Sequence, residues 1–216
     1  MTREEVKACI EEIGIFPGIR VNSADQALYA AKAIYDAGIP IAEITTTCPG
    51  AVNVISELAQ RYPDMVVGAG TVLDKETAER CLDAGARFLT STGLVPEVIG
   101  SALRRGVVVI PGALTPTEVI AAWKAGADYV KIYPSGALGG DLYIKSLKMP
   151  LPQVPLIAAG GVNQQTASGY ILAGATALGV GTELLPNEAI RRHQDHRISE
   201  LARRFRALVK EAREVR

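Results

Sequence analysis

The sequence has few of the residue types on which several common protein chemistries depend. Its 216 residues include two histidines, three cysteines and one tryptophan, and its formal net charge is zero. A chain without net charge has no overall attraction for nucleic acid or for an anionic membrane surface. We therefore expect neither a nucleic-acid partner nor a membrane partner.

Long apolar runs are also missing from the sequence. The longest, such as Val107–Ile110, are far shorter than the ~20 residues that a membrane-spanning helix requires. The first residues, Met1–Glu5, are charged and lack the apolar region of a secretory signal. Cys9, Cys48 and Cys81 have neither disulfide-framework nor metal-ligand spacing. We expect reduced thiols in a cytoplasmic protein.

The sequence does contain a repeat. Four similar segments, each with glycine as its third residue, are typical of helix ends. They are Asp36–Ile39, Asp83–Ala86, Lys124–Ala127 and Leu172–Ala175. A glycine just past a helix end commonly adopts the left-handed cap conformation. Further helix-end marks are Gly14, Gly106, Pro63 and Pro150. Together they divide the chain into eight units of roughly 20–25 residues, the size of one strand plus one helix.

Eight predicted strands follow this period, and several are near-continuous apolar runs, as expected of parallel strands covered on both faces. They are Ile15–Val21, Ile41–Thr47, Met65–Val72, Arg87–Thr92, Val107–Ala113, Tyr129–Pro134, Leu156–Gly161 and Ala177–Thr182. The pattern predicts a single (β/α)8 barrel domain over residues 1–216. A short helix over Glu4–Ile13 could close the barrel floor, and helical spacing of apolar residues after Ile198 predicts a C-terminal helix. An open doubly wound sheet is the alternative fold.

Helix starts agree with this division. Ser23–Gln26 and Thr115–Glu118 have the pattern of capping boxes, the second with proline at the first helical position. Asp74 and Asn163 are predicted caps of two further helices.

The active site of a (β/α)8 barrel lies at the C-terminal ends of its strands. Lys131 lies within a predicted strand, Glu43 within another, and Arg20 near the end of the first. A buried lysine must either pair with an acid or lose its proton. A neutral buried amine is also the nucleophile of Schiff-base enzymes. A purely structural ion pair is the alternative role for Lys131.

Glycines end the seventh and eighth predicted strands, as Gly160-Gly161 and within Gly179–Thr182. This is the usual phosphate position of the barrel architecture, where backbone N–H groups can approach an anion closely. Tight turns without a ligand are the alternative. Neither histidine lies near a strand, which excludes a Ser-His-Asp triad, and no cluster of carboxylates or histidines indicates a catalytic metal.

Several motifs taken together resemble those of the 2-keto-3-deoxy-6-phosphogluconate (KDPG) aldolase family. They are Ala42–Thr45, Val67–Leu73, Val109–Gly112, Val130–Ser135, Ala159–Val162 and Leu178–Gly181, in family order. The resemblance implies a class I, metal-independent aldolase without a cofactor, usually a homotrimer. It implies that Lys131 forms the Schiff base, that Glu43 is the acid/base, and that Arg20 and Thr71 meet the pyruvoyl part of the substrate. It implies further that Gly160, Gly161 and Thr182 bind phosphate, with Gly181 beside them.

One departure bears on the substrate. Gluconate-type members carry an arginine where this chain has Thr47, and this chain has Arg20 on the first strand instead. That arrangement is similar to the 2-keto-3-deoxy-6-phosphogalactonate (KDPGal) branch. We predict that Thr47 and Thr92 belong to the substrate site with the residues above.

The resemblance predicts cleavage of KDPG or KDPGal to pyruvate and glyceraldehyde 3-phosphate, with 4-hydroxy-2-oxoglutarate as a further candidate substrate. Two alternatives remain open. One is a lyase or isomerase that acts on a sugar phosphate without an imine. The other is a barrel that binds a sugar phosphate without catalysis.

Overall fold

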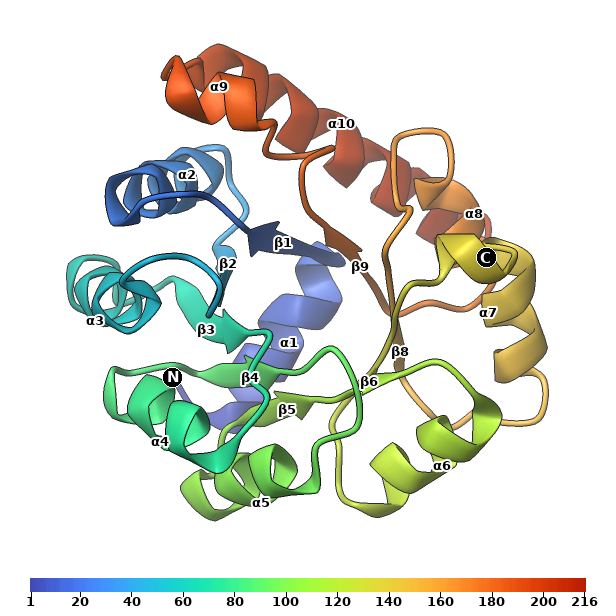
Figure 1. The fold of residues 1–216 in the computed structure, drawn as a ribbon. Coiled ribbons are helices and arrows are strands. Elements are labelled where there is room, and N and C mark those ends of the chain that lie inside the picture. Colours follow the sequence, from blue (N-terminus) through green and yellow to red (C-terminus); the bar gives the residue numbers. More distant parts are fainter.

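A computed structural model describes all residues, 1–216. Strands and helices alternate along the chain, and the helices surround a ring of strands (Figure 1). The strands are β1 (Ile15–Ile19), β2 (Ile41–Thr45), β3 (Val66–Gly70), β4 (Phe88–Thr90), β5 (Val108–Ile110), β6 (Gly112–Ala113), β7 (Val130–Ile132), β8 (Leu156–Ala159) and β9 (Ala177–Val180). The helices are α1 (Arg3–Ile13), α2 (Ala24–Asp36), α3 (Ala51–Arg61), α4 (Lys75–Asp83), α5 (Pro96–Arg105), α6 (Pro116–Lys124), a 3-10 turn (Gly136–Leu138), α7 (Asp141–Lys148), α8 (Ala167–Leu172), α9 (Asn187–Arg191) and α10 (Asp195–Glu214).

The strands form one parallel sheet in the order β5-β4-β3-β2-β1-β9-β8-β7-β6, which confirms the predicted barrel. The predicted strand Val107–Ala113 is divided into β5 and β6 at Pro111. Proline has no N–H to donate to a neighbouring strand, so the ladder is interrupted there. β5 pairs with β4, and β6 pairs with β7. The two halves of this strand therefore form the two edges of the sheet and lie next to each other in the chain.

The predicted strands are too long at most of their C-terminal ends. β1, β2, β3, β4 and β9 stop before Arg20, Thr46, Thr71, Ser91 and Gly181 respectively. The polar residues predicted at strand ends therefore lie in the first positions of the following loops. The Thr46 and Ser91 N–H groups still bond to the sheet, donating to the Gly70 and Ile110 carbonyls at 2.8 and 3.3 Å.

The predicted helix ends are confirmed. All six cap glycines have positive φ: Gly14, Gly38, Gly85, Gly106, Gly126 and Gly174. Thr115 and Glu118 form the predicted capping box, and the Asp74 side chain accepts from the Thr77 N–H at 2.7 Å.

Two cap predictions need correction. The Ser23 side chain accepts from the Gln26 N–H, but the Gln26 side chain accepts from the Asn22 N–H instead of completing a box with Ser23. Asn163 caps the turn that precedes α8, since its side chain accepts from the Gln165 and Thr166 N–H groups and the helix begins only at Ala167.

The barrel interior depends on two glycines of β3. A Cβ at Gly68 would lie 2.4 Å from the Phe88 ring, and one at Gly70 would lie 2.1 Å from Glu43 Oε1. Side chains from β4 and β2 thus occupy the space that these two glycines leave free. Phe88 also packs against Phe16, with ring centroids 4.7 Å apart. The alternation of glycine in Gly68-Ala69-Gly70 is therefore required by packing inside the barrel.

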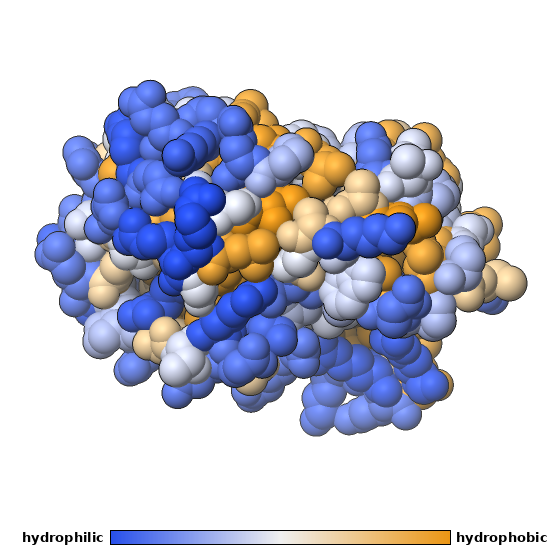
Figure 2. All heavy atoms as spheres, turned by 90° about the horizontal axis from the view of Figure 1, so that it is seen from below, coloured by the Kyte–Doolittle hydropathy of each residue, from blue (hydrophilic) through white to orange (hydrophobic).

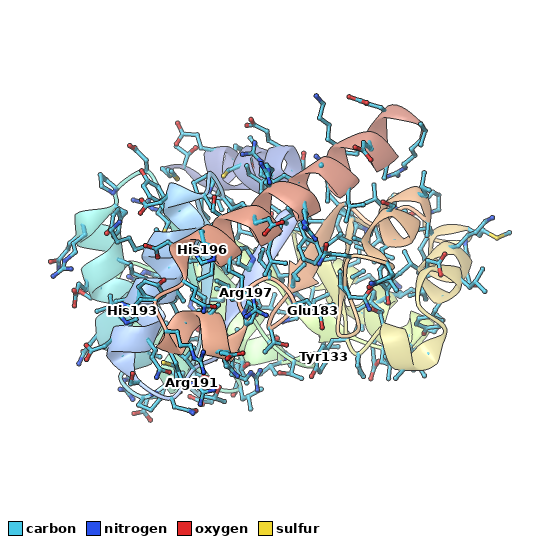
Figure 3. The ribbon with its side chains drawn as sticks, turned by 90° about the horizontal axis from the view of Figure 1, so that it is seen from above. Tyr133, Glu183, Arg191, His193, His196 and Arg197 are labelled. Atoms are coloured by element: carbon cyan, nitrogen blue, oxygen red, sulfur yellow. The ribbon has the colours of Figure 1, made fainter.

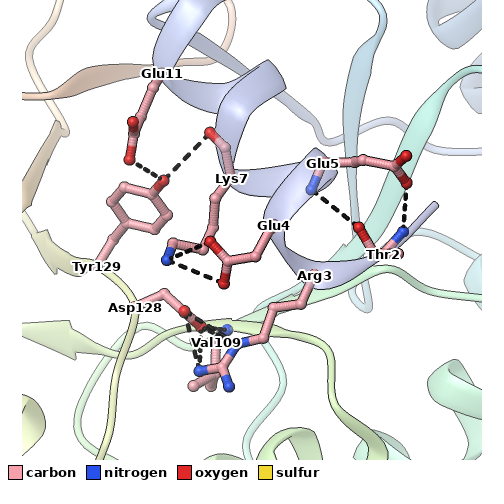
Figure 4. A network of polar contacts seen from close by, with 9 residues as sticks. All are labelled: Thr2, Arg3, Glu4, Glu5, Lys7, Glu11, Val109, Asp128 and Tyr129. Carbon is pink, nitrogen blue, oxygen red and sulfur yellow. Dashed lines mark hydrogen bonds and ion pairs between the residues drawn. The ribbon is translucent and has the colours of Figure 1, made fainter.

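Helix α1 closes the barrel floor, as predicted, and lies behind the ring of strands in Figure 1. Val6 and Ile10 on this helix are buried. Figure 4 shows its polar anchors: the Arg3 guanidinium donates to the Asp128 carboxylate at 3.0–3.3 Å, and the Tyr129 hydroxyl donates to Glu11 at 2.8 Å. Asp128 also accepts from the Val109 N–H, so this carboxylate joins α1 to β5.

The predicted C-terminal helix is α10, which packs against α2 and α8 (Figure 1). Two of its arginines reach the floor of the barrel. Arg206 donates to the Gly38 carbonyl at 3.1 Å, and Arg213 donates to the Glu12 and Thr176 carbonyls at 2.8 and 3.0 Å. These contacts bind α10 to the ends of α2 and α1. None of the helices combines the length and apolar composition required to cross a bilayer.

Candidate active site

A cavity of about 500 Å³ opens at the C-terminal ends of the strands. Its walls come from the ends of β1, β2, β3, β7, β8 and β9 and from the loops that follow. Of the residues that the sequence predicts for the site, the cavity brings together Arg20, Glu43, Thr71, Thr92, Lys131, Gly160, Gly161, Gly181 and Thr182. Thr47 is not among its walls. It is exposed beyond β2, with its hydroxyl 3.0 Å from that of Thr45.

Lys131 and Glu43 face each other from β7 and β2. Lys131 Nζ donates to Glu43 Oε1 at 3.3 Å, and the two side chains are 16% and 6% exposed. The Thr90 hydroxyl donates to the same oxygen, Oε1. Glu43 Oε2 accepts no hydrogen bond from the protein and is therefore free to exchange a proton with a ligand.

The strand register explains how a carboxylate fits at this place. Glu43 lies opposite Gly18 of β1 and opposite Gly68 of β3. A Cβ at position 18 would lie 3.3 Å from Glu43 Oε2. Lys131 likewise has a glycine, Gly112, opposite it on β6. Gly18 and Gly70 therefore leave space for the Glu43 carboxylate, whereas a Cβ at Gly112 would meet the Thr92 carbonyl at 2.1 Å.

The charged residues of the cavity are few. They are Arg20, Lys131, Glu43 and Glu183, two of each sign. Arg20 is the only cation besides Lys131, and its Nη2 lies 3.5 Å from the Thr71 hydroxyl oxygen. An arginine fork beside a hydroxyl suits a carboxylate, because both can donate to its oxygens.

The loops after β8 and β9 contribute no cation to the cavity wall but offer backbone donors. Gly160 and Gly161 have φ values of 78° and 92°, and a Cβ at Gly161 would lie 2.9 Å from the Gly136 Cα. A side chain at Gly161 would thus be strained and would meet backbone. The N–H groups of Gly160, Gly161, Gly181 and Thr182 donate to no protein acceptor. They can serve an anionic ligand together with the Thr182 hydroxyl.

Sequence reasoning missed several residues of the cavity, among them Tyr133, Asn163 and Glu183. The ring centroid of Tyr133 lies 5.8 Å from Lys131 Nζ. Tyr133 follows Lys131 by two positions, so the period of a strand places both side chains on one face and could have identified it. Asn163 and Glu183 lie in loops, where no such period applies.

Both histidines lie outside the cavity. Figure 3 shows His193 and His196 near the junction of α9 and α10, away from Tyr133 and Glu183. His193 stacks on Tyr29, with ring centroids 4.3 Å apart. No group of three or more histidine, cysteine, aspartate or glutamate side chains is placed to hold a metal ion.

The three thiols are unpaired and partly or fully buried. Burial raises the pKa of Cys9 and Cys48, and it raises the pKa of Cys81 to about 11. A protonated thiol is a weak nucleophile, so these cysteines are poorly suited to covalent catalysis.

Comparison with known proteins gives consistent results. The family model "KDPG and KHG aldolase" matches residues 6–201. The chain is 36% identical over 174 residues to the 2-dehydro-3-deoxy-6-phosphogalactonate aldolase of Escherichia coli K12. The aligned region covers 80% of this chain and 83% of the relative. It is 30% identical over 189 residues to the KHG/KDPG aldolase of the same organism, covering 88% and 89% of the two chains.

Solved structures agree with these relatives. A structure described as native KDPGal superposes with a TM-score of 0.82 at 32% identity, over 93% of this chain and 94% of that chain. The KDPG aldolase of Legionella pneumophila, with pyruvate captured as a covalent carbinolamine intermediate, superposes with a TM-score of 0.84 at 29% identity, over 91% and 96%. Because the family model matches nearly the whole chain, the protein belongs to the KDPG and KHG aldolase family.

Proposed function

We propose that the protein is a Schiff-base aldolase that cleaves a 2-keto-3-deoxy-6-phospho sugar acid to pyruvate and glyceraldehyde 3-phosphate. The observation that carries the proposal is the Lys131–Glu43 pair, 3.3 Å apart inside the cavity at the strand ends. An amine that can attack a ketone and a carboxylate that can move protons are the two groups this reaction requires. Membership of an aldolase family supports the same assignment.

The reaction begins when the Lys131 amine attacks the C2 ketone of the substrate. The carbinolamine loses water, and the iminium that results can accept the electrons of the C3–C4 bond. Glu43 takes the proton of the C4 hydroxyl, the C3–C4 bond breaks, and the aldehyde leaves. The enamine is then protonated at C3, and water hydrolyses the iminium to pyruvate and free Lys131. Glu43 Oε2 suits both proton transfers, since no protein donor occupies it.

KDPGal is the proposed preferred substrate, ahead of KDPG. Arg20 lines the cavity beside Thr71, whereas Thr47 lies outside its walls. The substrate carboxylate would therefore meet a cation from β1 and none from β2. The higher identity to the KDPGal aldolase relative, 36% against 30%, supports this branch.

The phosphate of the substrate is assigned to the loops after β8 and β9. The free N–H groups of Gly160, Gly161, Gly181 and Thr182 support this assignment. The Tyr133 ring lies near both Lys131 and the loop after β8. A Cβ at Gly160 would lie 3.1 Å from the Tyr133 ring, and the ring centroid lies 5.8 Å from Lys131 Nζ.

Borohydride reduction in the presence of pyruvate tests the proposal. Intact mass should show one stable pyruvate adduct, and peptide mapping should place it on Lys131. Lys148 is the stringent comparison, because partial burial lowers the pKa of Lys148 and the residue lies outside the cavity. Lys131→Ala should abolish the adduct, and Lys148→Ala should leave it unchanged.

The same experiment separates the alternatives. A label on Lys148 or Lys145 in place of Lys131 would contradict the assignment of the imine. Cleavage activity without an adduct would favour an imine-independent lyase or isomerase. Absence of both adduct and turnover, with retained binding of a sugar phosphate, would favour a non-catalytic binding barrel.

A homotrimer in the cytoplasm completes the proposal. Large apolar side chains are exposed on adjacent outer helices, including Leu103, Ile120, Leu142 and Met149. Figure 2 shows hydrophobic residues crossing the middle of the face that carries α5 and α6, between hydrophilic margins. Exposed apolar patches of this kind are typical of interfaces. A similar chain, 31% identical with a TM-score of 0.86, occurs in a cage designed by fusing symmetric oligomeric domains. Light scattering coupled to size exclusion would measure the assembly.

A further inference from the structure

Thr71 has an unusual backbone conformation for its residue type. Its φ is +59°, and apart from His193 it is the only non-glycine residue of the chain with positive φ. A branched Cβ makes the left-handed region unfavourable, so such a residue persists only where its surroundings hold it. Thr71 follows β3 directly and lines the cavity. Its conformation sets where its hydroxyl lies relative to a substrate.

One residue holds the backbone on both sides of this conformation. The Thr46 N–H donates to the Gly70 carbonyl at 2.8 Å, and the Thr46 hydroxyl donates to the Thr71 carbonyl at 2.8 Å. The next N–H along the chain, that of Val72, donates to the Thr90 carbonyl at 3.0 Å. The hydroxyl of Thr46 is the only side-chain donor in this set.

The three consecutive threonines after Ile44 therefore have different partners. Thr45 donates to the Ile19 carbonyl at 3.1 Å, and the Thr47 hydroxyl contacts only that of Thr45. Thr46 alone reaches the loop after β3. It is itself half-buried and is not a wall of the cavity, so it cannot act on a ligand directly.

We propose that Thr46 is a positioning residue for the substrate carboxylate. Its hydroxyl holds Thr71 in the left-handed conformation, and Thr71 in turn places its own hydroxyl beside the Arg20 guanidinium, 3.5 Å away. This inference rests on the proposed function, because it assumes that a 2-keto acid binds with its carboxylate at Arg20 and Thr71. Thr46 thus takes part in recognition of the substrate carboxylate although it lies outside the cavity.

The test compares Thr46→Val, which keeps the shape and removes the hydroxyl, with Thr46→Ser, which keeps the hydroxyl. Thr46→Val should raise the pyruvate concentration for half-maximal trapping on Lys131 by about 5- to 30-fold, the effect of losing one well-formed hydrogen bond. In cleavage assays KM should rise, while kcat should change by less than about threefold. Thr46→Ser should remain close to the unmodified protein.

Thr176→Val is the matched control. Thr176 is a half-buried threonine directly before β9, on the floor of the barrel, and its hydroxyl makes no hydrogen bond. This variant should leave pyruvate trapping unchanged. If Thr46→Val does not fold, the pair Thr46→Ala and Thr46→Ser gives the same comparison, since these two differ only by the hydroxyl.

Testing Thr46→Val in the Thr71→Gly protein distinguishes positioning of the Thr71 hydroxyl from general support of the loop after β3. Glycine adopts positive φ without a steric cost, and Thr71→Gly leaves no hydroxyl to be positioned. The effect of Thr46→Val on half-maximal trapping should therefore disappear in the Thr71→Gly protein. An equal effect in both backgrounds would overturn the inference, as would unchanged trapping in Thr46→Val. If the unmodified protein forms no pyruvate adduct at all, the proposed function itself fails, which is a separate and recognisable outcome.

Discussion

Removal of the Arg20 side chain tests the charge balance of the cavity. A 2-keto acid brings a carboxylate into a space that already contains Glu43 and Glu183, and Arg20 is the only cation there apart from Lys131. Arg20→Ala would remove the guanidinium that lies 3.5 Å from the Thr71 hydroxyl and leave Lys131 as the only cation of the cavity. We expect weaker binding of every 2-keto acid, whether pyruvate itself or a longer sugar acid.

The magnitude follows from the position of Arg20. A hydrogen bond to a charged group contributes ~1.5–3 kcal/mol, whereas exposed ion pairs contribute ~0.2–1 kcal/mol. Arg20 is exposed in the open cavity but would be partly covered by a bound substrate. We therefore expect a loss of about 1–2 kcal/mol, which corresponds to roughly a 5- to 30-fold higher half-saturating pyruvate concentration.

Borohydride trapping over a range of pyruvate concentrations, read by intact mass, measures this quantity. Arg191→Ala is the matched control. Arg191 is an exposed arginine on α9 outside the cavity walls, so its loss changes net charge without changing the site (Figure 3). The double change Arg20→Ala with Thr47→Arg should recover part of the loss and shift preference toward KDPG. Unchanged trapping in Arg20→Ala would refute the carboxylate role and remove the main reason to favour KDPGal.

Three further predictions follow from the same geometry. Glu43→Gln should reduce cleavage by ~10²–10⁴-fold in a coupled pyruvate-release assay while still forming adduct, and activity within about twofold would show that Glu43 is only an ion-pair partner. Thr182→Val should raise KM for the phosphorylated substrate by roughly 5- to 30-fold without changing pyruvate trapping, and equal losses for both would indicate general damage. Burial raises the pKa of Cys81 from 9.0 to about 11, so its contribution to stability should be present below pH 9 and lost as pH rises toward 11. Urea titrations of the unmodified protein and Cys81→Ala at pH 8 and pH 10.5 would measure this, and identical pH dependence would contradict it.

The sequence predicts the barrel because the signals that mark its helix ends and strands are local. Each cap glycine marks a helix end through its own φ, and each apolar run marks a strand through its own composition. The position of Lys131 and Glu43 at one end of the barrel follows from the fold, since parallel strands present their C-terminal ends on one face. These features required no knowledge of contacts between distant residues.

The features that were missed depend on such contacts. Asn163 has a good capping side chain, but that side chain hydrogen-bonds within the turn after β8, before α8 begins. The run Thr45-Thr46-Thr47 reads as three equivalent hydroxyls, and only the loop after β3, some 25 residues away, distinguishes the second from the others. The positive φ of Thr71 has no signal in its own residue type, because threonine is unfavourable there.

The proposed proton-transfer groups and the proposed phosphate-binding groups come from different elements around the cavity. In the proposed reaction the groups that change charge are Lys131 and Glu43, which face each other from β7 and β2 at 3.3 Å. When the iminium forms, Lys131 carries a positive charge, and together with Arg20 it balances Glu43 and the substrate carboxylate. The loops after β8 and β9 offer N–H groups and the Thr182 hydroxyl and carry no cation of their own, so in the proposed reaction they orient a phosphate more than they pair with its charge. Changes at the glycine loops should therefore alter which aldehyde is released, whereas changes at Arg20 should alter binding of all 2-keto acids alike.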